Sequence, residues 1–244
     1  MKQLLIFDLS NVCYIGAKSR RSAEEPSEAL YFENTLNYLR DQYRYFQPDH
    51  VVFACDHEDI YWRTQIFPEY KAQRVDNEFK QLIRRVIKRF KTEKKDICIE
   101  IPHCEADDII YALCAYTPFN VTIISSDGDF EQLLSERVRL FSPTRGEFRE
   151  RTKNGSFDLF VKCIRGDVSD NIPAALPMVT RKKLQEAFRT PDPVTFLAEH
   201  YHKKHPNFAT DFARNKQLID LQSVPDDLKN LMRAEIERFF KEPS

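Results

Sequence analysis

Long apolar runs, paired cysteines and an excess of either charge are all missing from this sequence of 244 residues. No stretch approaches the roughly 18 uncharged apolar residues of a membrane span. The apolar run near the N-terminus is interrupted at Asp8, so we interpret it as a first strand and not as a signal peptide. A disordered chain is also excluded, because 42% of the residues are apolar and 12% are aromatic. We expect one domain, or a domain with a smaller lobe.

The six cysteines include no CxxC pair, and no histidines accompany them at the spacing of a zinc site. Most of them lie inside apolar runs, where a free cysteine behaves as a small apolar residue. We therefore expect reduced structural thiols and a cytoplasmic location. These residues are Cys13, Cys55, Cys98, Cys104, Cys114 and Cys163.

Short apolar segments alternate with helical ones in the first part of the chain. The spacing of apolar residues predicts, in order, strand 3–8, helix 27–46, strand 50–54, strand 97–101, helix 105–116 and strand 120–126. This alternation predicts an α/β fold with a mostly parallel central sheet flanked by helices. Residues 137–150 predict a further strand and a turn, and the chain is mostly helical from about residue 156 onward.

Acidic residues stand where four of the predicted strands end. Any one of them alone would be read as a helix cap or a turn residue. Together they would meet at one edge of the sheet, because the carboxyl ends of parallel strands share an edge and ligands bind there. A last acidic pair in the helical part could join them. In chain order the acids are Asp8, Asp56, Glu105, Asp107, Asp108, Asp127, Asp129, Asp167 and Asp170.

So many like charges cannot share a pocket unless cations neutralise them. Carboxylate oxygens without histidine or cysteine partners select Mg²⁺ or Mn²⁺ over zinc. Two such ions about 4 Å apart are a common arrangement for the in-line hydrolysis of phosphodiesters. The acids therefore predict a two-metal hydrolytic site.

A basic segment lies between the second and third predicted strands. Residues 71–95 contain ten basic and three acidic side chains, whereas the whole chain has a net charge of −1. In isolation such a run is usually a solvated helix face, but beside an acidic metal pocket it is better read as a track for a polyanion. Upstream, Tyr61-Trp62-Arg63 and Tyr70-Lys71 place aromatic rings beside cations. These rings could stack on bases or simply pack in the core, and the sequence leaves both readings open.

The order of these motifs resembles the 5′-nuclease superfamily of flap endonucleases and 5′→3′ exonucleases, in particular phage ribonuclease H-type 5′-nucleases. The resemblance covers nearly the whole chain. It rests on Asp8, Asp56, Tyr61-Trp62-Arg63, the segment 68–74, Glu105-Ala106-Asp107-Asp108, the segment 125–130, the segment 166–171, and Leu218-Ile219-Asp220-Leu221 with Pro225-Asp226.

The resemblance implies a PIN-like nuclease core at 1–155, which includes a basic helical arch at about 57–96, and a helical DNA-binding lobe at 156–244. It implies two Mg²⁺ ions, for which Mn²⁺ would substitute. The first ion would be held by Asp8, Asp56, Glu105, Asp107, Asp108 and Asp127. The second would be held, directly or through water, by Asp129, Asp167 and Asp170, with a share from Asp127.

Lys71 and Arg74 would stabilise the scissile phosphate, and Asp8 and Asp127 would be the central catalytic acids. The remaining nucleic-acid contacts implied by the resemblance are Tyr70, Lys80, Arg84, Arg85, Lys88, Arg181, Lys182 and Lys183.

One segment departs from the family pattern. The family has a glycine-rich hairpin between two helices, which binds the duplex backbone and a potassium ion. Here its three glycine positions are occupied by Ala174, Pro177 and Val179. Proline lacks a backbone donor, and valine does not easily adopt positive φ. We therefore expect a degenerate helix-hairpin-helix at about 166–188, an altered grip on duplex and no dependable potassium site.

The expected function is a metal-dependent 5′-nuclease that acts on flaps, on nicked or gapped duplex and on RNA–DNA hybrids. RNA primer removal in phage replication would be its context, with a single-strand binding protein or a polymerase as partner, the host cytoplasm as its location and a monomer as the default state.

Two other hypotheses remain. A branched-DNA binding protein without catalysis would gain only repulsion from nine carboxylates near DNA. A smaller PIN-domain ribonuclease would lack both the arch and the segment 166–171.

Overall fold

The computed structural model describes residues 1–18, 25–58 and 61–241. The chain forms two compact units, each built from segments that are distant in sequence. The first unit contains residues 1–61, 76–151 and 225–244, and the second contains residues 62–75 and 152–224.

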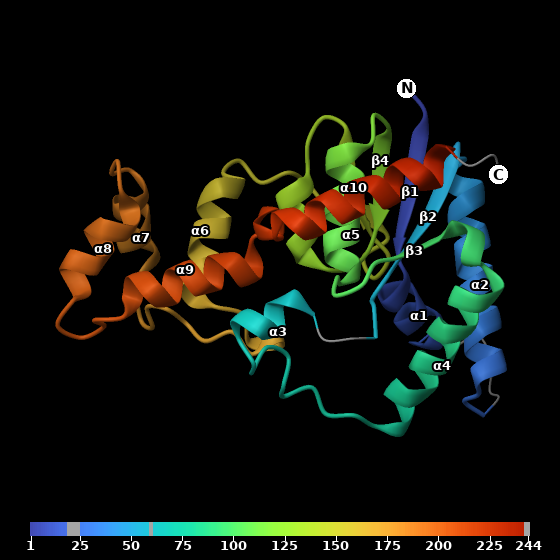
Figure 1. Cartoon of the computed structure of the whole chain (residues 1–244), viewed down its shortest axis with the longest axis horizontal. Helices are drawn as coiled ribbons and strands as arrows, with labels where there is room; N and C mark the ends of the chain where they lie inside the picture. Colours follow the sequence, from blue (N-terminus) through green and yellow to red (C-terminus); the bar gives the residue numbers. More distant parts are fainter. Residues whose placement is uncertain (19–24, 59–60, 242–244) are drawn as a thin grey trace. The chain divides into compact units, whose positions relative to one another are not determined.

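The first unit is built on a six-stranded sheet with the order β3-β2-β1-β4-β5-β6 (Figure 1). Every neighbouring pair is parallel except β5 and β6, which form an antiparallel hairpin. The strands are β1 (Gln3–Asp8), β2 (His50–Cys55), β3 (Cys98–Glu100), β4 (Asn120–Ile124), β5 (Val138–Ser142) and β6 (Glu147–Phe148).

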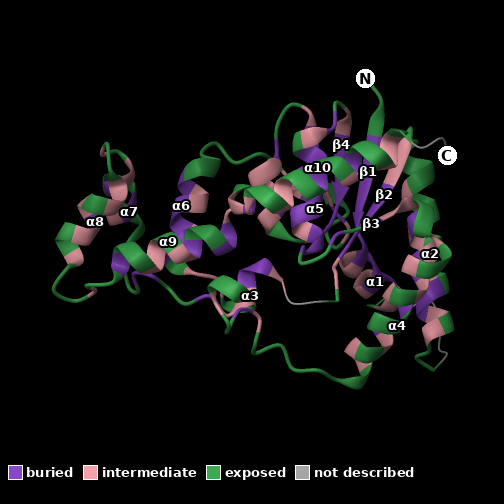
Figure 2. Ribbon diagram, viewed as in Figure 1, coloured by how far each residue is buried: buried purple, intermediate pink, exposed green. Residues whose placement is uncertain are grey.

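Helices cover both faces of this sheet, so its central strands are buried (Figure 2). Helices α1 (Leu9–Lys18), α2 (Glu28–Phe46) and α4 (Glu78–Glu93) pack together over Leu5 and Phe7 of β1. On the other side, α5 (Ala106–Tyr116) packs against β1, β2 and α10 (Asp226–Lys241). Short 3-10 turns η1 (Lys95–Ile97) and η2 (Gly128–Leu133) precede β3 and follow β4.

The second unit is helical. Its helices are α3 (Trp62–Ile66), α6 (Gly155–Arg165), α7 (Arg181–Phe188), α8 (Pro193–Tyr201) and α9 (Phe208–Ile219), with the 3-10 turns η3 (Val168–Asp170) and η4 (Leu221–Ser223). Phe160, Leu184 and Leu197 lie in its main core. Arg63 of α3 is only 2% exposed, because its Nε donates to the Leu218 carbonyl at 3.0 Å and its guanidinium stacks on Trp62.

The structure confirms the α/β fold and a strand in each predicted segment. The compact units divide the chain differently from the predicted boundaries, since residues 225–244 lie in the first unit and residues 62–75 in the second. All six cysteines are free thiols, as expected. Over the described ranges, no helix combines the length and the apolar character that a bilayer span requires.

Gly16 is required where α1 crosses α2. A Cβ atom there would lie 2.1 Å from Thr35 Oγ1 and 2.8 Å from the Thr35 backbone nitrogen, and the Thr35 backbone cannot move aside easily. We expect Gly16→Ala to lower the free energy of unfolding by about 1–3 kcal/mol, as overpacking does. The matched control is Gly155→Ala, whose Cβ meets its nearest atom at an ordinary 3.7 Å. Urea denaturation of both variants tests this, and equal stabilities would contradict it.

Candidate functional site

Parallel pairing aligns the ends of β1 and β2. Asp8, the last residue of β1, is in register with Ala54 of β2, and Asp56 follows two residues later. Asp8 is 7% exposed, and its carboxylate accepts hydrogen bonds from Ser125 Oγ at 2.9 Å and from the Asn11 amide at 3.0 Å. Asp56 accepts from Ser10 Oγ at 2.6 Å and from the Ala106 amide at 3.0 Å. Both carboxylates are thus oriented by neutral donors.

The end of β4 contributes the next acids. The Asp127 carboxylate caps η2 by accepting from the Asp129 amide at 2.8 Å. The Asp127 amide in turn donates to Ser125 Oγ at 3.1 Å. The same hydroxyl therefore contacts both Asp8 and Asp127, which ties the end of β4 to the end of β1.

The acidic group at the start of α5 has a structural role. Glu105 and Asp108 form a capping box, and the Glu105 amide donates to Asp108 Oδ2 at 3.0 Å. Their side chains are 2% and 0% exposed. The cap interpretation that applied to each acid in isolation therefore holds at this helix. Asp107, between them, is half-buried in the first turn of α5.

The pKa of Asp8 is raised from 3.8 to about 7. Burial is the largest cause, and repulsion by Asp56 and Asp127 adds to it, against the stabilising hydrogen bonds from Asn11 and Ser125. Asp8, Asp56 and Asp127, from the ends of three neighbouring strands, therefore form one electrostatic cluster.

Within residues 1–18, 25–58 and 61–241, no three His, Cys, Asp or Glu side chains are arranged as a ready metal-binding group. The chemistry of the cluster nevertheless fits a hard divalent cation, because its donors are carboxylate oxygens. The repulsion of Asp8 by Asp56 and Asp127 also indicates that negative charge is in excess there.

Asp167 and Asp170 belong to the second unit and are surrounded by cations. Arg74 lies 2.7 Å from Asp170 Oδ1, and Lys71 Nζ lies 3.9 Å from Oδ2. Lys162 pairs with Asp167 at 2.8 Å. Burial raises the pKa of Asp167, but the Lys162 contact and the hydrogen bonds from Ser169 outweigh burial and lower this pKa to about 2.

The basic segment is partly neutralised by ion pairs within the first unit. Ion pairs join side chains of α4 to acids of this unit: Arg84 with Asp76 at 2.5 Å, Arg85 with Glu28 at 3.6 Å, Arg89 with Glu93 at 2.6 Å and Lys91 with Glu100 at 2.6 Å. Two of these partners, Glu28 and Glu100, lie outside residues 71–95 and offset part of the net positive charge of the segment. Lys80 and Lys88 also lie on α4.

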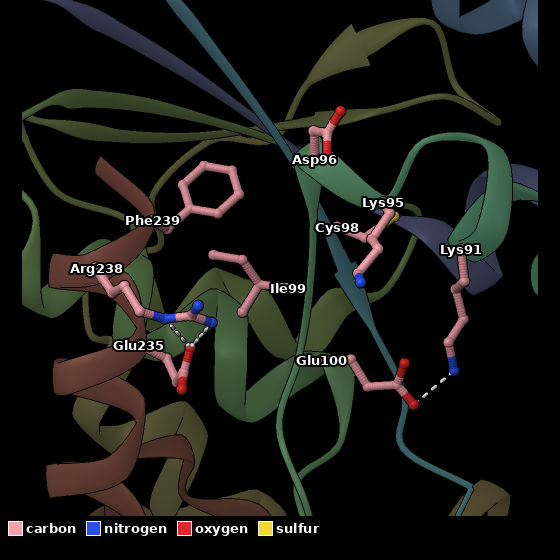
Figure 3. Close-up of a pocket in the computed structure, with 9 residues that line it drawn as sticks. All are labelled: Lys91, Lys95, Asp96, Cys98, Ile99, Glu100, Glu235, Arg238 and Phe239. Atoms are coloured by element: carbon pink, nitrogen blue, oxygen red, sulfur yellow. Dashed lines mark hydrogen bonds and ion pairs between the residues drawn. The ribbon is translucent and has the colours of Figure 1, made fainter. Parts of the chain in front are cut away.

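Figure 3 shows a groove of about 390 Å³ that contains part of this segment. Lys91 and Lys95 line it together with Arg238 of α10. Two of these basic residues form ion pairs in the groove: Lys91 lies 2.6 Å from Glu100, and Arg238 lies 2.6 Å from Glu235. With Asp96 also present, three acids balance three bases, so this groove does not have the positive excess of a polyanion track.

Two of the three aromatic residues beside the cations, Trp62 and Tyr70, are buried, whereas Tyr61 is half-buried. Trp62 is 4% and Tyr70 is 5% exposed, and the Tyr70 hydroxyl donates to Asp170 Oδ2 at 3.2 Å. Of the two readings that the sequence left open, burial favours packing over base stacking for both rings.

The degenerate hairpin is built without glycine at its centre. The left-handed conformation occurs at Gly166, Asn171 and Met178, and not at Ala174, Pro177 or Val179. Val179 is buried, whereas Met178 is 99% exposed. The three basic residues that follow start α7. Of these, Arg181 lies 3.7 Å from Asp158 and Lys183 lies 3.2 Å from Glu186.

Sequence reasoning missed the neutral residues that orient the acids. Ser10, Asn11 and Ser125 each contact the Asp8–Asp56–Asp127 cluster or its immediate neighbours. The available signal was their position, since Ser10 and Asn11 lie two and three residues after the end of β1 and Ser125 directly follows β4.

Comparison with known proteins now adds to this geometry. A family model described as the 5′-3′ exonuclease, N-terminal resolvase-like domain, matches residues 4–158. The chain belongs to the 5′-3′ exonuclease family. It is 35% identical to DNA polymerase I of Helicobacter pylori over 92 residues, which cover 37% of this chain and 10% of the polymerase. It is 28% identical to flap endonuclease Xni of Psychromonas ingrahamii over 154 residues, 59% of this chain and 58% of Xni.

These matches span less than two thirds of either relative. The fold also matches the bacteriophage T5 D15 protein crystallised with metal ions, with a TM-score of 0.74 and 20% identity, over 98% of this chain and 99% of that one. A T5 D15 flap endonuclease complex with DNA and metal ions matches with the same TM-score of 0.74. At this identity the likeness confirms the 5′-nuclease fold of the chain.

The charge of Asp8 should limit stability. The pKa of Asp8 in the folded state lies above its ordinary value, so the folded state binds the proton more tightly than the unfolded state does. The contribution of this proton to the free energy of unfolding is lost as the pH rises from about 4 through about 7. Asp8→Asn removes the buried charge and should raise the free energy of unfolding in EDTA near pH 8 by about 2–4 kcal/mol. The gain should shrink near pH 4. Urea titrations at both pH values test this, with the exposed Asp96→Asn as control. A destabilised Asp8→Asn protein at about pH 8 would contradict it.

Proposed function

We propose that this chain is a divalent-metal-dependent 5′-nuclease that hydrolyses phosphodiester bonds near the 5′ ends of flaps, nicked or gapped duplex DNA and RNA–DNA hybrids. The observation that carries the proposal is the cluster of Asp8, Asp56 and Asp127, whose mutual repulsion helps to raise the pKa of Asp8 to about 7. A catalytic protein gains from such a cluster because it attracts divalent cations. Membership of the 5′-3′ exonuclease family supports the same reaction class.

The residues that would hold metal ions are the acids of the first unit, centred on Asp8, Asp56 and Asp127. The sequence resemblance adds Glu105, Asp107, Asp108 and Asp129, and it adds Asp167 and Asp170 from the second unit. When bound, Mg²⁺ or Mn²⁺ would supply activation of the attacking water and stabilisation of negative charge on the phosphate.

The chain's own residues prepare this chemistry. Ser10 and the Ala106 amide hold both oxygens of Asp56, while Ser125 and the Asn11 amide hold both oxygens of Asp8. This orientation reduces the rearrangement needed when an ion binds. Lys71 and Arg74 would stabilise the scissile phosphate electrostatically.

Removal of RNA primers and flaps during replication is the proposed context. Two kinds of relative support it: DNA polymerase I of several bacteria, and a protein named as a flap endonuclease. A single-strand binding protein or a polymerase would be the partner, and the monomer the active form.

Cleavage assays test the function directly. The substrates are 5′-labelled flap, nicked duplex and RNA–DNA hybrid, each with Mg²⁺ or with EDTA. We expect short products from the wild type in Mg²⁺ only, and none from Asp127→Asn, because loss of one carboxylate charge weakens ion binding. Near-normal Mg²⁺-dependent cleavage by Asp127→Asn would show that the acids are wrongly assigned. Binding without cleavage in every metal would instead support a DNA-binding protein of this fold.

Ser125 provides a test of the orientation of the acids. Ser125→Ala removes the hydroxyl that donates to Asp8 and accepts from the Asp127 amide. Because such supporting contacts position ligands, we expect a loss of about 10–100-fold in Mg²⁺-dependent cleavage. Ser142→Ala is the control, since Ser142 is an equally buried serine of the same sheet that contacts Thr144. Equal activity of the two variants would show that Ser125 has no orienting role.

A further inference from the structure

Within the second unit, residues 69–74 are fastened to the loop 167–171. The Lys71 amide donates to the Asp170 carbonyl at 2.9 Å, and Asn171 Nδ2 donates to the Glu69 carbonyl at 2.7 Å. Gln73 Nε2 lies 2.9 Å from the Val168 carbonyl and 3.1 Å from the Ser169 carbonyl. These contacts hold the backbone of the two segments together whatever the side chain of Asp170 does.

The Asp170 carboxylate is held by three side chains of the same segment. Oδ1 lies 2.7 Å from Arg74, and Oδ2 lies 3.2 Å from the Tyr70 hydroxyl and 3.9 Å from Lys71 Nζ. Lys71 Nζ also lies 4.9 Å from the centre of the Tyr70 ring, which keeps it near the carboxylate. Both oxygens of Asp170 are therefore occupied by donors from residues 70–74.

Two of these donors are the residues proposed to bind the scissile phosphate, and Asp170 is one of the acids proposed to bind an ion. A divalent ion in contact with Asp170 would need the lone pairs that Arg74 and Lys71 now use. It would also repel both side chains, because all three groups are positive.

We propose that the Asp170 carboxylate holds Lys71 and Arg74 in ion pairs until a divalent ion binds to it. The ion then replaces both side chains, which become available to bind phosphate. The inference rests on the proposed function and deepens it, since it makes the two phosphate-binding cations available only when the metal is present. By linkage, the competition acts in both directions: if ion binding weakens the Asp170–Arg74 pair, then that pair weakens ion binding by the same factor.

This reciprocity gives a test that does not depend on cleavage. Mn²⁺ is titrated into the full chain, and free Mn²⁺ is measured by its electron paramagnetic resonance signal. Asp170→Asn should abolish one Mn²⁺ site. Arg74→Gln removes the competing cation and should increase the Mn²⁺ affinity of that site by about twofold to fivefold, which is the effect of one partly exposed ion pair. Lys71→Gln should act in the same direction and less strongly, because its ion-pair distance is longer.

Two controls separate competition from general electrostatics. Arg165→Gln removes the same charge two residues before Asp167, from an exposed side chain at the end of α6, and should leave Mn²⁺ affinity unchanged. In the Asp170→Asn background, Arg74→Gln should no longer change the affinity of the remaining Mn²⁺. Thermal melts of each variant in EDTA verify folding.

The inference is overturned if Arg74→Gln lowers the melting temperature without changing Mn²⁺ affinity, since Asp170 would then be only a structural brace. It is also overturned if Arg165→Gln gives the same shift, or if the shift persists without Asp170. If the wild type cleaves flaps and binds Mn²⁺, but Arg74→Gln leaves the Mn²⁺ affinity unchanged both with and without Asp170→Asn, the exchange is refuted and the proposed function stays intact. A wild type that binds no Mn²⁺ would refute both.

Discussion

A carboxylate buried at the end of the central strand is the constraint on which the first unit depends. Burying an unpaired charge is costly, and the donors that stabilise Asp8 are two neutral groups, the Ser125 hydroxyl and the Asn11 amide. These two donors come from β4 and α1, so holding Asp8 in place also aligns the end of β4 with the end of β1. The neighbouring acids add repulsion, which protonation of Asp8 relieves and a bound cation would relieve as well.

The acids of the two units have opposite electrostatic surroundings, and the pKa values of Asp8 and Asp167 are shifted in opposite directions. In the first unit, neutral hydroxyl and amide donors orient Asp8 and Asp56, and the pKa of Asp8 rises. In the second unit, lysine and arginine side chains surround Asp167 and Asp170, and the pKa of Asp167 falls. The carboxylate charges of the second unit are thus compensated by ion pairs, whereas the groups that orient Asp8 and Asp56 carry no charge.

Much of the fold could be predicted because its signals are local. Buried parallel strands are short continuous apolar runs, and those ending at Asp8, Asp56 and Asp127 were recognisable for that reason. The ion pairs of the basic segment could not be predicted in the same way. Arg85 pairs with Glu28, which lies on α2, and Lys91 pairs with Glu100 in β3. Periodicity shows which residues share a helix face, but it does not show which acids of other elements meet that face.

The sequence by itself determined the element order, the α/β class and the positions of acids at strand ends, because each depends on residues adjacent in the chain. Only the tertiary structure decided which of the predicted site residues are buried and which are paired. Trp62 and Tyr70 are buried in the core, and the Asp170 carboxylate is paired with Arg74 and accepts from the Tyr70 hydroxyl. These outcomes depend on contacts across as many as 100 positions of sequence, such as Tyr70 with Asp170. Burial and pairing at that separation are set by packing, which no local pattern encodes.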